Sequence, residues 1–221
     1  MTARLVDVRV LATVATAGLL AAAPAIAPAQ RTAPEASARS THVIAACLVR
    51  NASRPASAFL ATAPTQSQAR LLADLGPALN ECAAEAGGEG QELRLSAAAV
   101  RGPIAEAFFE RDFNGWSPRN GRRPVTVYPA TPPPAEVPRA RLLADMAACV
   151  ADARPADVLT LLATSPASAG EGQATAALVP ALGPCFRAGQ TADVSRSQLR
   201  GLLAEAAYRR AAGLAGTTAA R

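Results

Sequence analysis

Two glutamates, Glu106 and Glu205, are the residues whose type and placement could support catalysis by this chain. They stand at equivalent places in two similar stretches, VRGPIAEAFFER at 100–111 and LRGLLAEAAYRR at 199–210. Two carboxylates brought into one cleft could act as acid and base, or bind a cation. The repetition therefore raises one catalytic hypothesis, a hydrolase that uses this duplicated pair.

A structural role for the same positions is the favoured interpretation. Each glutamate follows an arginine, Arg101 or Arg200, by five residues. Residues at i and i+5 do not share a helix face, so the arginine and the glutamate should bond to different neighbours. We expect one structural arginine and one structural glutamate per copy, tying the last helix of that copy to its first or third helix. A binding role for these pairs stays open.

No other arrangement typical of an enzyme stands out in the sequence. His42 is the only histidine, and we interpret it as an ordinary residue near a helix start. Nucleophilic catalysis needs a base beside the nucleophile, and no glycine-rich elbow, P-loop or G-x-G-x-x-G stretch is present. The sequence predicts no catalytic residue, metal or cofactor. It favours a non-enzymatic protein and leaves enzymatic activity open.

The four cysteines predict two disulfides. Cys47 and Cys82 in the first copy match Cys149 and Cys185 in the second. Of the three possible connectivities, the repetition favours Cys47–Cys82 and Cys149–Cys185. A metal site is the competing interpretation. It is weak because the chain has no CxxC motif and a single histidine.

A tandem duplication explains the order of several short motifs. Arg-Pro, Leu-Ala-Thr-x-Pro, Pro-Ala-Leu-x-x-Cys and Arg-Gly-x-x-Ala-Glu occur twice in the same order, about one hundred residues apart. In the first copy, helical periodicity predicts helices over 41–50, 54–62, 65–82 and 97–111, with a kink or break at Gly76-Pro77. Ser96 and Ser195 are placed as N-caps, and Ser195 with Gln198 has capping-box spacing. The predicted fold is all-α, a tandem duplication of a disulfide-closed four-helix unit.

The segment between the copies has no repeat. It contains the only tryptophan, Trp116, with Arg119, Arg122 and Arg123 close behind, and it ends in a proline-rich stretch. Aromatic and arginine residues together are typical of nucleic-acid or anionic-glycan surfaces. We favour a linker whose Phe113 and Trp116 dock on the first unit, with an interaction segment as the alternative.

The N-terminus is typical of a secretory signal. Arg4 and Arg9 form a short positive region, an apolar stretch covers 10–23, and Ala27-Pro28-Ala29 fits a cleavage site before Gln30. An uncleaved anchor is the alternative. Export would place the cysteines in an oxidising compartment, where disulfides persist. The expected product is periplasmic or secreted, and it is not an integral membrane protein after cleavage.

These features predict the organisation and the function class. The expected segments are a signal peptide (1–29), a disordered leader (30–40), unit 1 (41–111), a linker (112–138), unit 2 (139–212) and a flexible tail (213–221). A formal charge of +5 is mild, and outside the cytoplasm we expect no nucleic-acid partner. We expect a non-enzymatic binding or scaffolding module of the bacterial cell envelope, with an unknown envelope protein or small ligand as partner. The alternative is an envelope hydrolase that uses Glu106 and Glu205.

Overall fold

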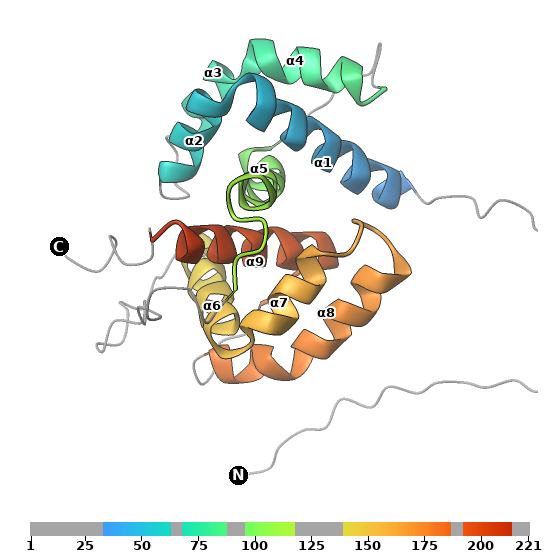
Figure 1. Cartoon of the computed structure of the whole chain (residues 1–221), viewed down its shortest axis with the longest axis vertical. Coiled ribbons are helices and arrows are strands. Elements are labelled where there is room, and N and C mark those ends of the chain that lie inside the picture. Colours follow the sequence, from blue (N-terminus) through green and yellow to red (C-terminus); the bar gives the residue numbers. More distant parts are fainter. Residues whose placement is uncertain (1–32, 63–67, 88–95, 118–138, 187–191, 214–221) are drawn as a thin grey trace, which may run out of the picture. The chain divides into compact units, whose positions relative to one another are not determined.

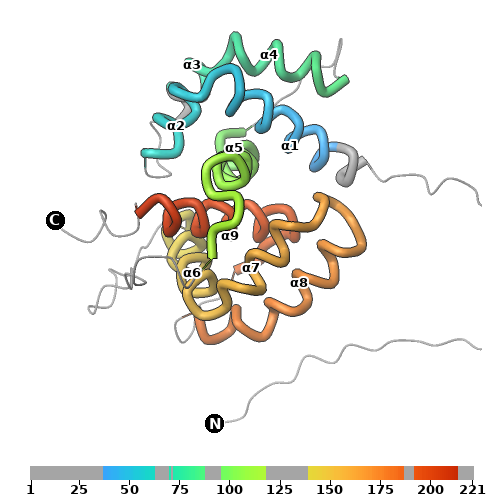
Figure 2. Tube along the Cα trace, viewed as in Figure 1, coloured from blue at the N-terminus to red at the C-terminus, as the bar shows by residue number. Residues whose placement is uncertain are grey.

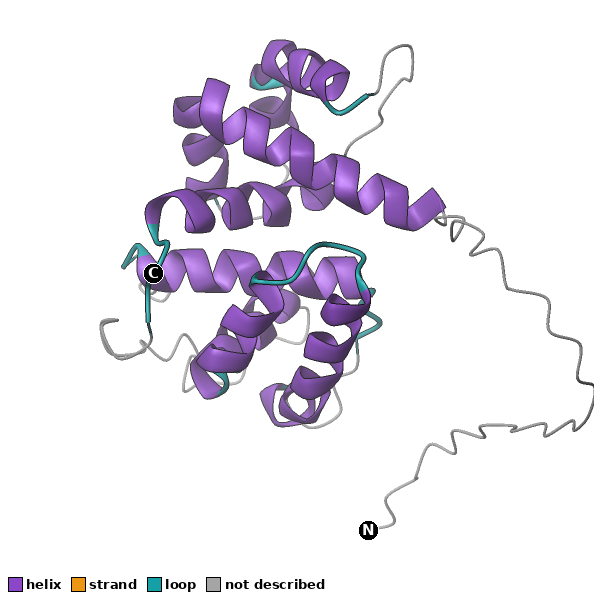
Figure 3. Cartoon of the chain, turned by 45° about the vertical axis from the view of Figure 1, so that its right-hand side comes forward, coloured by secondary structure: helices purple, strands orange, loops and turns teal. Residues whose placement is uncertain are grey.

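Helices are the only regular elements in the part of the chain that the structure describes. The computed structural model describes residues 33–62, 68–87, 96–117, 139–186 and 192–213, and Figure 3 shows the helices in purple. The first half holds α1 (Ala33–Asn51), α2 (Ser53–Ala61), α3 (Gln68–Asp74), α4 (Gly76–Glu85) and α5 (Ala97–Asp112). The second half holds α6 (Arg139–Ala153), α7 (Pro155–Leu162), α8 (Ala169–Leu182), the short 3-10 helix η1 (Gly183–Cys185) and α9 (Arg196–Ala211). The all-α prediction is confirmed.

Helices α5 and α9 join the two halves. They form the most extensive helix–helix contact among the described elements and lie side by side in Figures 1 and 2. Helix α5 is buried without interruption from Val100 to Glu106, so it has no solvent-facing side over nearly two turns. The halves belong to one compact unit, Arg31–Arg221.

Each half has its own apolar core, and α5 contributes to both. The first core includes Ile44, Leu48, Phe59, Ile104 and Phe108. The second core includes Met146, Val150, Leu161, Leu178 and Leu203. Phe109 leaves α5 on the side of the second core, and Tyr208 of α9 packs against both clusters. The aromatic residues therefore connect the two cores.

The two disulfides confirm the predicted pairing. Cys47 of α1 bonds to Cys82 of α4, and Cys149 of α6 bonds to Cys185 of η1. The two bonds span 35 and 36 residues, and both have a Cα–Cα distance of 5.6 Å. Each bond ties the first helix of its half to the segment that precedes the last helix.

The predicted caps of the two central helices are also confirmed. The Ser96 hydroxyl accepts from the Ala99 amide at the start of α5. Ser195 and Gln198 form a full capping box at the start of α9. At the start of α8 the Ser168 hydroxyl accepts from the Glu171 amide, a cap that was not predicted from the sequence. These caps satisfy amide groups that a helix start leaves without partners.

One helix start differs from the prediction, and one predicted break is present. Helix α1 begins at Ala33, inside the stretch predicted as a disordered leader, and Arg39 of this stretch donates to two backbone oxygens of the second half. The break predicted at Gly76-Pro77 is confirmed, because the helical stretch is divided at Leu75 into α3 and α4, and Pro77 has no amide hydrogen to continue the hydrogen-bond ladder. The predicted signal peptide, 1–29, and most of the predicted linker, 118–138, lie outside the described residues.

Candidate functional site

The repeated glycines allow α5 and α9 to touch backbone to backbone. Gly102 follows Arg101 on α5, and Gly201 follows Arg200 on α9. The two glycines are each other's nearest neighbours across the contact. Because neither glycine has a side chain, the helices approach closely enough for the arginine of each helix to reach the glutamate of the other.

The first cluster is built on Arg101. Its Nε donates to Oε2 of Glu205 and its Nη2 donates to Oε1, both at 2.8 Å. The same guanidinium donates to the backbone oxygens of Phe59 (2.9 Å), Leu60 (2.9 Å) and Thr62 (2.7 Å) at the end of α2. Cations interact favourably with the free carbonyls of a helix C-terminus. Arg101 thus caps the C-terminus of α2, and the same guanidinium also binds the second half of the chain.

Glu205 has a second cationic partner. Arg209, one turn further along α9, donates from Nε to Oε1 of Glu205 at 2.8 Å and from Nη2 to the Leu60 oxygen at 2.8 Å. Burial of Glu205 favours its neutral form. Hydrogen bonds and charge from Arg101 and Arg209 outweigh burial and hold the pKa of this carboxyl below its ordinary value.

The second cluster repeats this geometry with the halves exchanged. Arg200 Nε donates to Oε1 and Oε2 of Glu106 at 3.1 and 3.0 Å, and its Nη2 also binds this carboxylate. Its guanidinium donates to the backbone oxygens of Leu161 (3.2 Å), Leu162 (3.3 Å) and Thr164 (2.7 Å) at the end of α7. Arg200 thus caps the C-terminus of α7 as Arg101 caps that of α2.

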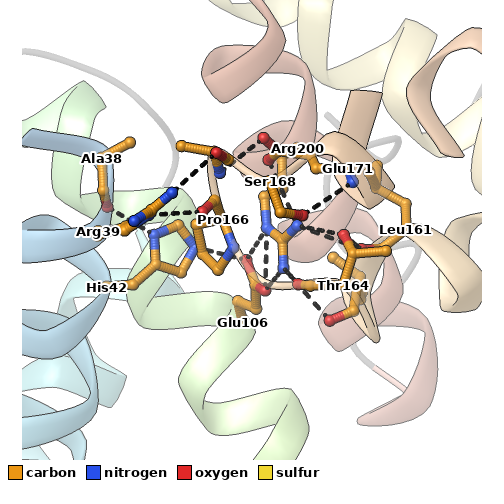
Figure 4. Close-up of polar contacts among 12 residues, drawn as sticks. Ala38, Arg39, His42, Glu106, Leu161, Thr164, Pro166, Ser168, Glu171 and Arg200 are labelled. Atoms are coloured by element: carbon orange, nitrogen blue, oxygen red, sulfur yellow. Dashed lines mark hydrogen bonds and ion pairs between the residues drawn. The ribbon is translucent and has the colours of Figure 1, made fainter. Parts of the chain in front are cut away.

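Two further residues distinguish the second cluster from the first. Glu171 of α8 accepts from Nη1 of Arg200 at 3.3 Å and from the Ala167 amide at 2.8 Å. His42 of α1 contacts the other member of the ion pair, with its Nε2 at 2.9 Å from Oε2 of Glu106. Figure 4 shows side chains from both halves converging on Glu106 and Arg200.

His42 is held between two oxygen acceptors. Its Nδ1 lies 3.0 Å from the backbone oxygen of Ala38, and its Nε2 faces the Glu106 carboxylate. Burial lowers the pKa of His42, but the hydrogen bond to Glu106, the negative charge of Glu106 and the Ala38 carbonyl outweigh burial and raise it above its ordinary value. With both ring nitrogens engaged, neither is free to act as a general base toward a substrate.

Glu106 is a buried acceptor with no free position for chemistry. Its side chain is 2 % exposed and binds both His42 and Arg200. Burial favours the neutral carboxyl, yet the hydrogen bonds and charges of these two partners lower its pKa. A general acid needs a raised pKa to hold its proton near neutral pH, and both Glu106 and Glu205 shift the opposite way.

The arginines and glutamates have the predicted partners only in part. The sequence predicts that they tie the last helix of each unit to its own first or third helix. Glu106 does contact the first helix of its half, through His42 of α1. Each arginine, however, binds the end of the second helix of its own half, and each glutamate binds the arginine of the other half. The prediction assumed that each half was complete alone, whereas these residues form the contact between the halves.

The tryptophan docks on a different core from the predicted one. Phe113 and Trp116 pack against the second core instead of the first. Phe109 directs them there, because it points from α5 into the second core and makes an edge-on contact with Trp116, with a centroid distance of 6.0 Å. Arg119, Arg122 and Arg123, the other members of the predicted interaction segment, lie outside the described residues.

Sequence reasoning misses His42, Arg39 and Glu171 as members of the cluster. Arg39 donates to the backbone oxygens of Pro166 (3.2 Å) and Ala167 (3.1 Å) in the turn before α8. None of the three residues has a counterpart in the repeated motifs. The one signal was the helical spacing of Arg39 and His42, three residues apart and thus on one face.

The described residues contain no group of three or more His, Cys, Asp or Glu side chains that could hold a metal ion. Among the described helices, none combines the length and the apolar character needed to cross a bilayer. Comparison of the chain with protein-family models, curated proteins and solved structures finds no match.

Proposed function

We propose that this protein is an exported, non-enzymatic binding or scaffolding module of the bacterial cell envelope. The observation that carries the proposal is the use of Arg101, Glu106, Arg200 and Glu205. All four side chains are buried or largely buried, and they are engaged with one another or with helix ends. Through these ion pairs and hydrogen bonds, the four residues fix the arrangement of the two halves. They are not free to bind and transform a substrate.

Export is supported by the two disulfides. Disulfides persist in oxidising compartments and are rare in the cytosol. A protein recovered from the envelope fraction, digested without reduction and mapped by mass spectrometry should begin at Gln30 and contain peptides joined through Cys47–Cys82 and Cys149–Cys185. A retained N-terminus would indicate an uncleaved anchor instead.

A tandem duplication of a four-helix unit is the origin we propose for this architecture. The two arginines bind backbone oxygens at positions that also match in sequence, 59, 60 and 62 in the first half and 161, 162 and 164 in the second. The reciprocal ion pairs and the facing glycines give the contact the character of a two-fold interface, in which residue i meets j and j meets i.

The alternative, an envelope hydrolase that uses Glu106 and Glu205, has less support. Paired-carboxylate hydrolysis needs one carboxyl that keeps its proton near neutral pH. Both candidate carboxyls have lowered pKa values, and each is bound by arginine from the other half.

The substitution Glu205→Gln distinguishes a structural role from a catalytic or binding role. We expect it to lower the melting temperature by roughly 5–10 °C, since an interrupted buried ion pair costs a few kcal/mol. The matched control is Glu85→Gln, which removes an exposed ion pair with Arg50 and should change stability little. Unchanged stability in the Glu205 variant, together with loss of a hydrolytic or binding activity, would favour the hydrolase or a ligand site.

A further inference from the structure

The protonation state of His42 determines whether its ring donates one hydrogen bond or two. Both of its neighbours, the Ala38 carbonyl and the Glu106 carboxylate, are acceptors. Only the doubly protonated ring donates to both. A neutral ring would turn a nitrogen lone pair toward one of these oxygens.

We propose that His42 is a proton-sensitive latch that holds α1 on Glu106 of α5 and, through Arg200, on the second half of the chain. Its doubly protonated form holds the first turns of α1 on Glu106 and, through Arg200, on α7 and α8. Loss of one proton loosens this contact. The inference goes beyond the proposed function and does not depend on what the protein binds.

The charge balance of the cluster supports the latch. With His42 protonated, the cations His42 and Arg200 balance the carboxylates Glu106 and Glu171. Deprotonation leaves a negative charge without compensation among side chains that, apart from His42, are at most 4 % exposed. An uncompensated buried charge is strongly destabilising. The surroundings therefore resist deprotonation as long as the contact is closed.

Hydrogen bonds from Arg39 show that the latch acts on the N-terminal part of α1. Arg39 lies one turn before His42 on α1, and it donates to the Pro166 and Ala167 oxygens of the turn between α7 and α8. Arg39 thus binds the second half directly, and His42, one turn further along α1, reaches it only through Glu106 of α5 and its partner Arg200 (Figure 4). Weakening of the His42 contact leaves Arg39 as the main polar link at that end.

The other charges near His42 come from α5 and α9. Glu110, one turn after Glu106, has its pKa raised by burial and by the charge of Glu106, and His42 opposes this shift. Arg200 of α9 acts against protonation of His42 but less strongly than Glu106 acts for it. The ion pair between α1 and α4, Arg50 with Glu85, involves the last turn of α1, two turns away from His42.

The pKa direction gives the sign of the effect. His42 has a raised pKa in the closed state, and its side chain is 22 % exposed, so protons can reach it. Its contribution to the contact is fully present below the pKa of a free histidine, about 6.5, and is lost as the pH rises through the raised value. The latch is therefore closed in mildly acidic conditions and looser in alkaline ones.

The test uses the full chain, in which His42 is the only histidine. Its ring proton resonance, followed by NMR from about pH 5 to about pH 9, reports the pKa without assignment ambiguity. In parallel, hydrogen exchange corrected for the intrinsic pH effect measures opening of peptides that cover 37–45 and 164–172. Linkage requires a loss of protection of about tenfold for each unit by which the pKa exceeds that of free histidine.

Two variants make the result decisive. His42→Gln can still donate to Glu106 but has no proton to lose, so its protection in these peptides should not change with pH. Glu106→Gln should lower the pKa of His42 to the free value or below it. The proposal is overturned if His42 in the wild-type chain titrates at or below the free value, or if it titrates higher while protection of both peptides stays constant. The wild-type titration decides the matter even if a variant fails to fold.

Discussion

Gly102 of α5 and Gly201 of α9 face each other with no side chain between them. A Cβ atom built on Gly102 would lie 2.2 Å from the Cα of Gly201, whereas one built on Gly201 would lie 3.1 Å from the Cα of Gly102. Both atoms that the new carbon would meet belong to the backbone of a helix, so no flexible side chain can move aside. The contact between the halves depends on this approach, because the arginine–glutamate pairs flank it.

Alanine at these two glycines should destabilise the protein to different extents. We expect Gly102→Ala to lower the free energy of unfolding by about 3 kcal/mol or more, since overpacking of a core costs about 1–3 kcal/mol and here the backbones must separate. Gly201→Ala should cost less, because its Cβ meets the opposite backbone at a longer distance. Urea unfolding followed by circular dichroism measures both.

Gly183→Ala is the matched control for the glycine substitutions. Gly183 has helical dihedral angles and nothing within 4 Å of a built Cβ. Alanine there should change stability by about 1 kcal/mol or less, because the entropy that it removes from the unfolded state is offset by the crowding of its Cβ against the ring of Pro184. Equal effects of alanine at 102 and 183 would contradict the close contact.

The helices, caps and disulfides could be predicted from the sequence because they depend on local or repeated signals. The hydroxyl of Ser96 and the capping box of Ser195 follow from spacing alone, and the cysteine pairing follows from repetition. The partners of Arg101 and Glu106 were not predicted, since helical periodicity within one half does not show which helix of the other half it faces. The clue was Gly102, a helix-interior glycine that costs stability unless a neighbouring backbone needs the space.

The substitution of Arg101 by lysine should lower the stability of the protein. Arg101 makes five hydrogen bonds from one planar guanidinium, to Glu205 and to three carbonyls at the end of α2. A lysine ammonium has three donors and cannot span these acceptors, so buried carbonyls would lose their partners. We expect Arg101→Lys to cost about 2–4 kcal/mol of stability in urea unfolding.

Arg209→Lys is the matched control for Arg101→Lys. Arg209 binds the same two residues, Glu205 and Leu60, but it is 27 % exposed and makes fewer bonds. Its replacement should cost about 1 kcal/mol or less. A similar loss of stability in both variants would show that Arg101 acts through its positive charge and not through the number and geometry of its hydrogen-bond donors.

The two disulfides should differ in their resistance to reduction. Cys47 and Cys82 are completely buried, at 1 % and 0 % exposure, whereas Cys149 and Cys185 are partly exposed. Under limiting reductant and native conditions, Cys149–Cys185 should open first, since thiol attack needs access to sulfur. Alkylation of the freed thiols followed by peptide mass mapping identifies the bond.

Loss of either disulfide should lower stability by a similar amount. The loops that they close are nearly equal, 35 and 36 residues, and loop entropy assigns about 4 kcal/mol to each. Alanine replacement of each cysteine pair, compared by thermal unfolding, checks this. Preferential reduction of Cys47–Cys82 would contradict the order of access that burial predicts.

Two glutamates one turn apart on α5 should respond to acid in opposite ways. Glu106 has a lowered pKa, so it contributes stability that is present above the unfolded pKa, about 4.3, and is lost as the pH falls through its folded value. Glu110 has a raised pKa because burial and the charge of Glu106 oppose its ionisation. Its charged form therefore works against folding above that same unfolded value.

The substitutions Glu106→Gln and Glu110→Gln test this contrast. At pH about 5.5, where His42 stays protonated, Glu106→Gln should cost about 2 kcal/mol or more and flatten the fall in stability toward low pH. Glu110→Gln should leave stability unchanged or raise it slightly under the same conditions, because it removes a carboxylate that its surroundings disfavour. Melting temperatures from about pH 3 to about pH 6 measure both effects. A parallel acid response in the two variants would show that the partners of Glu106, His42 and Arg200, do not stabilise its charge.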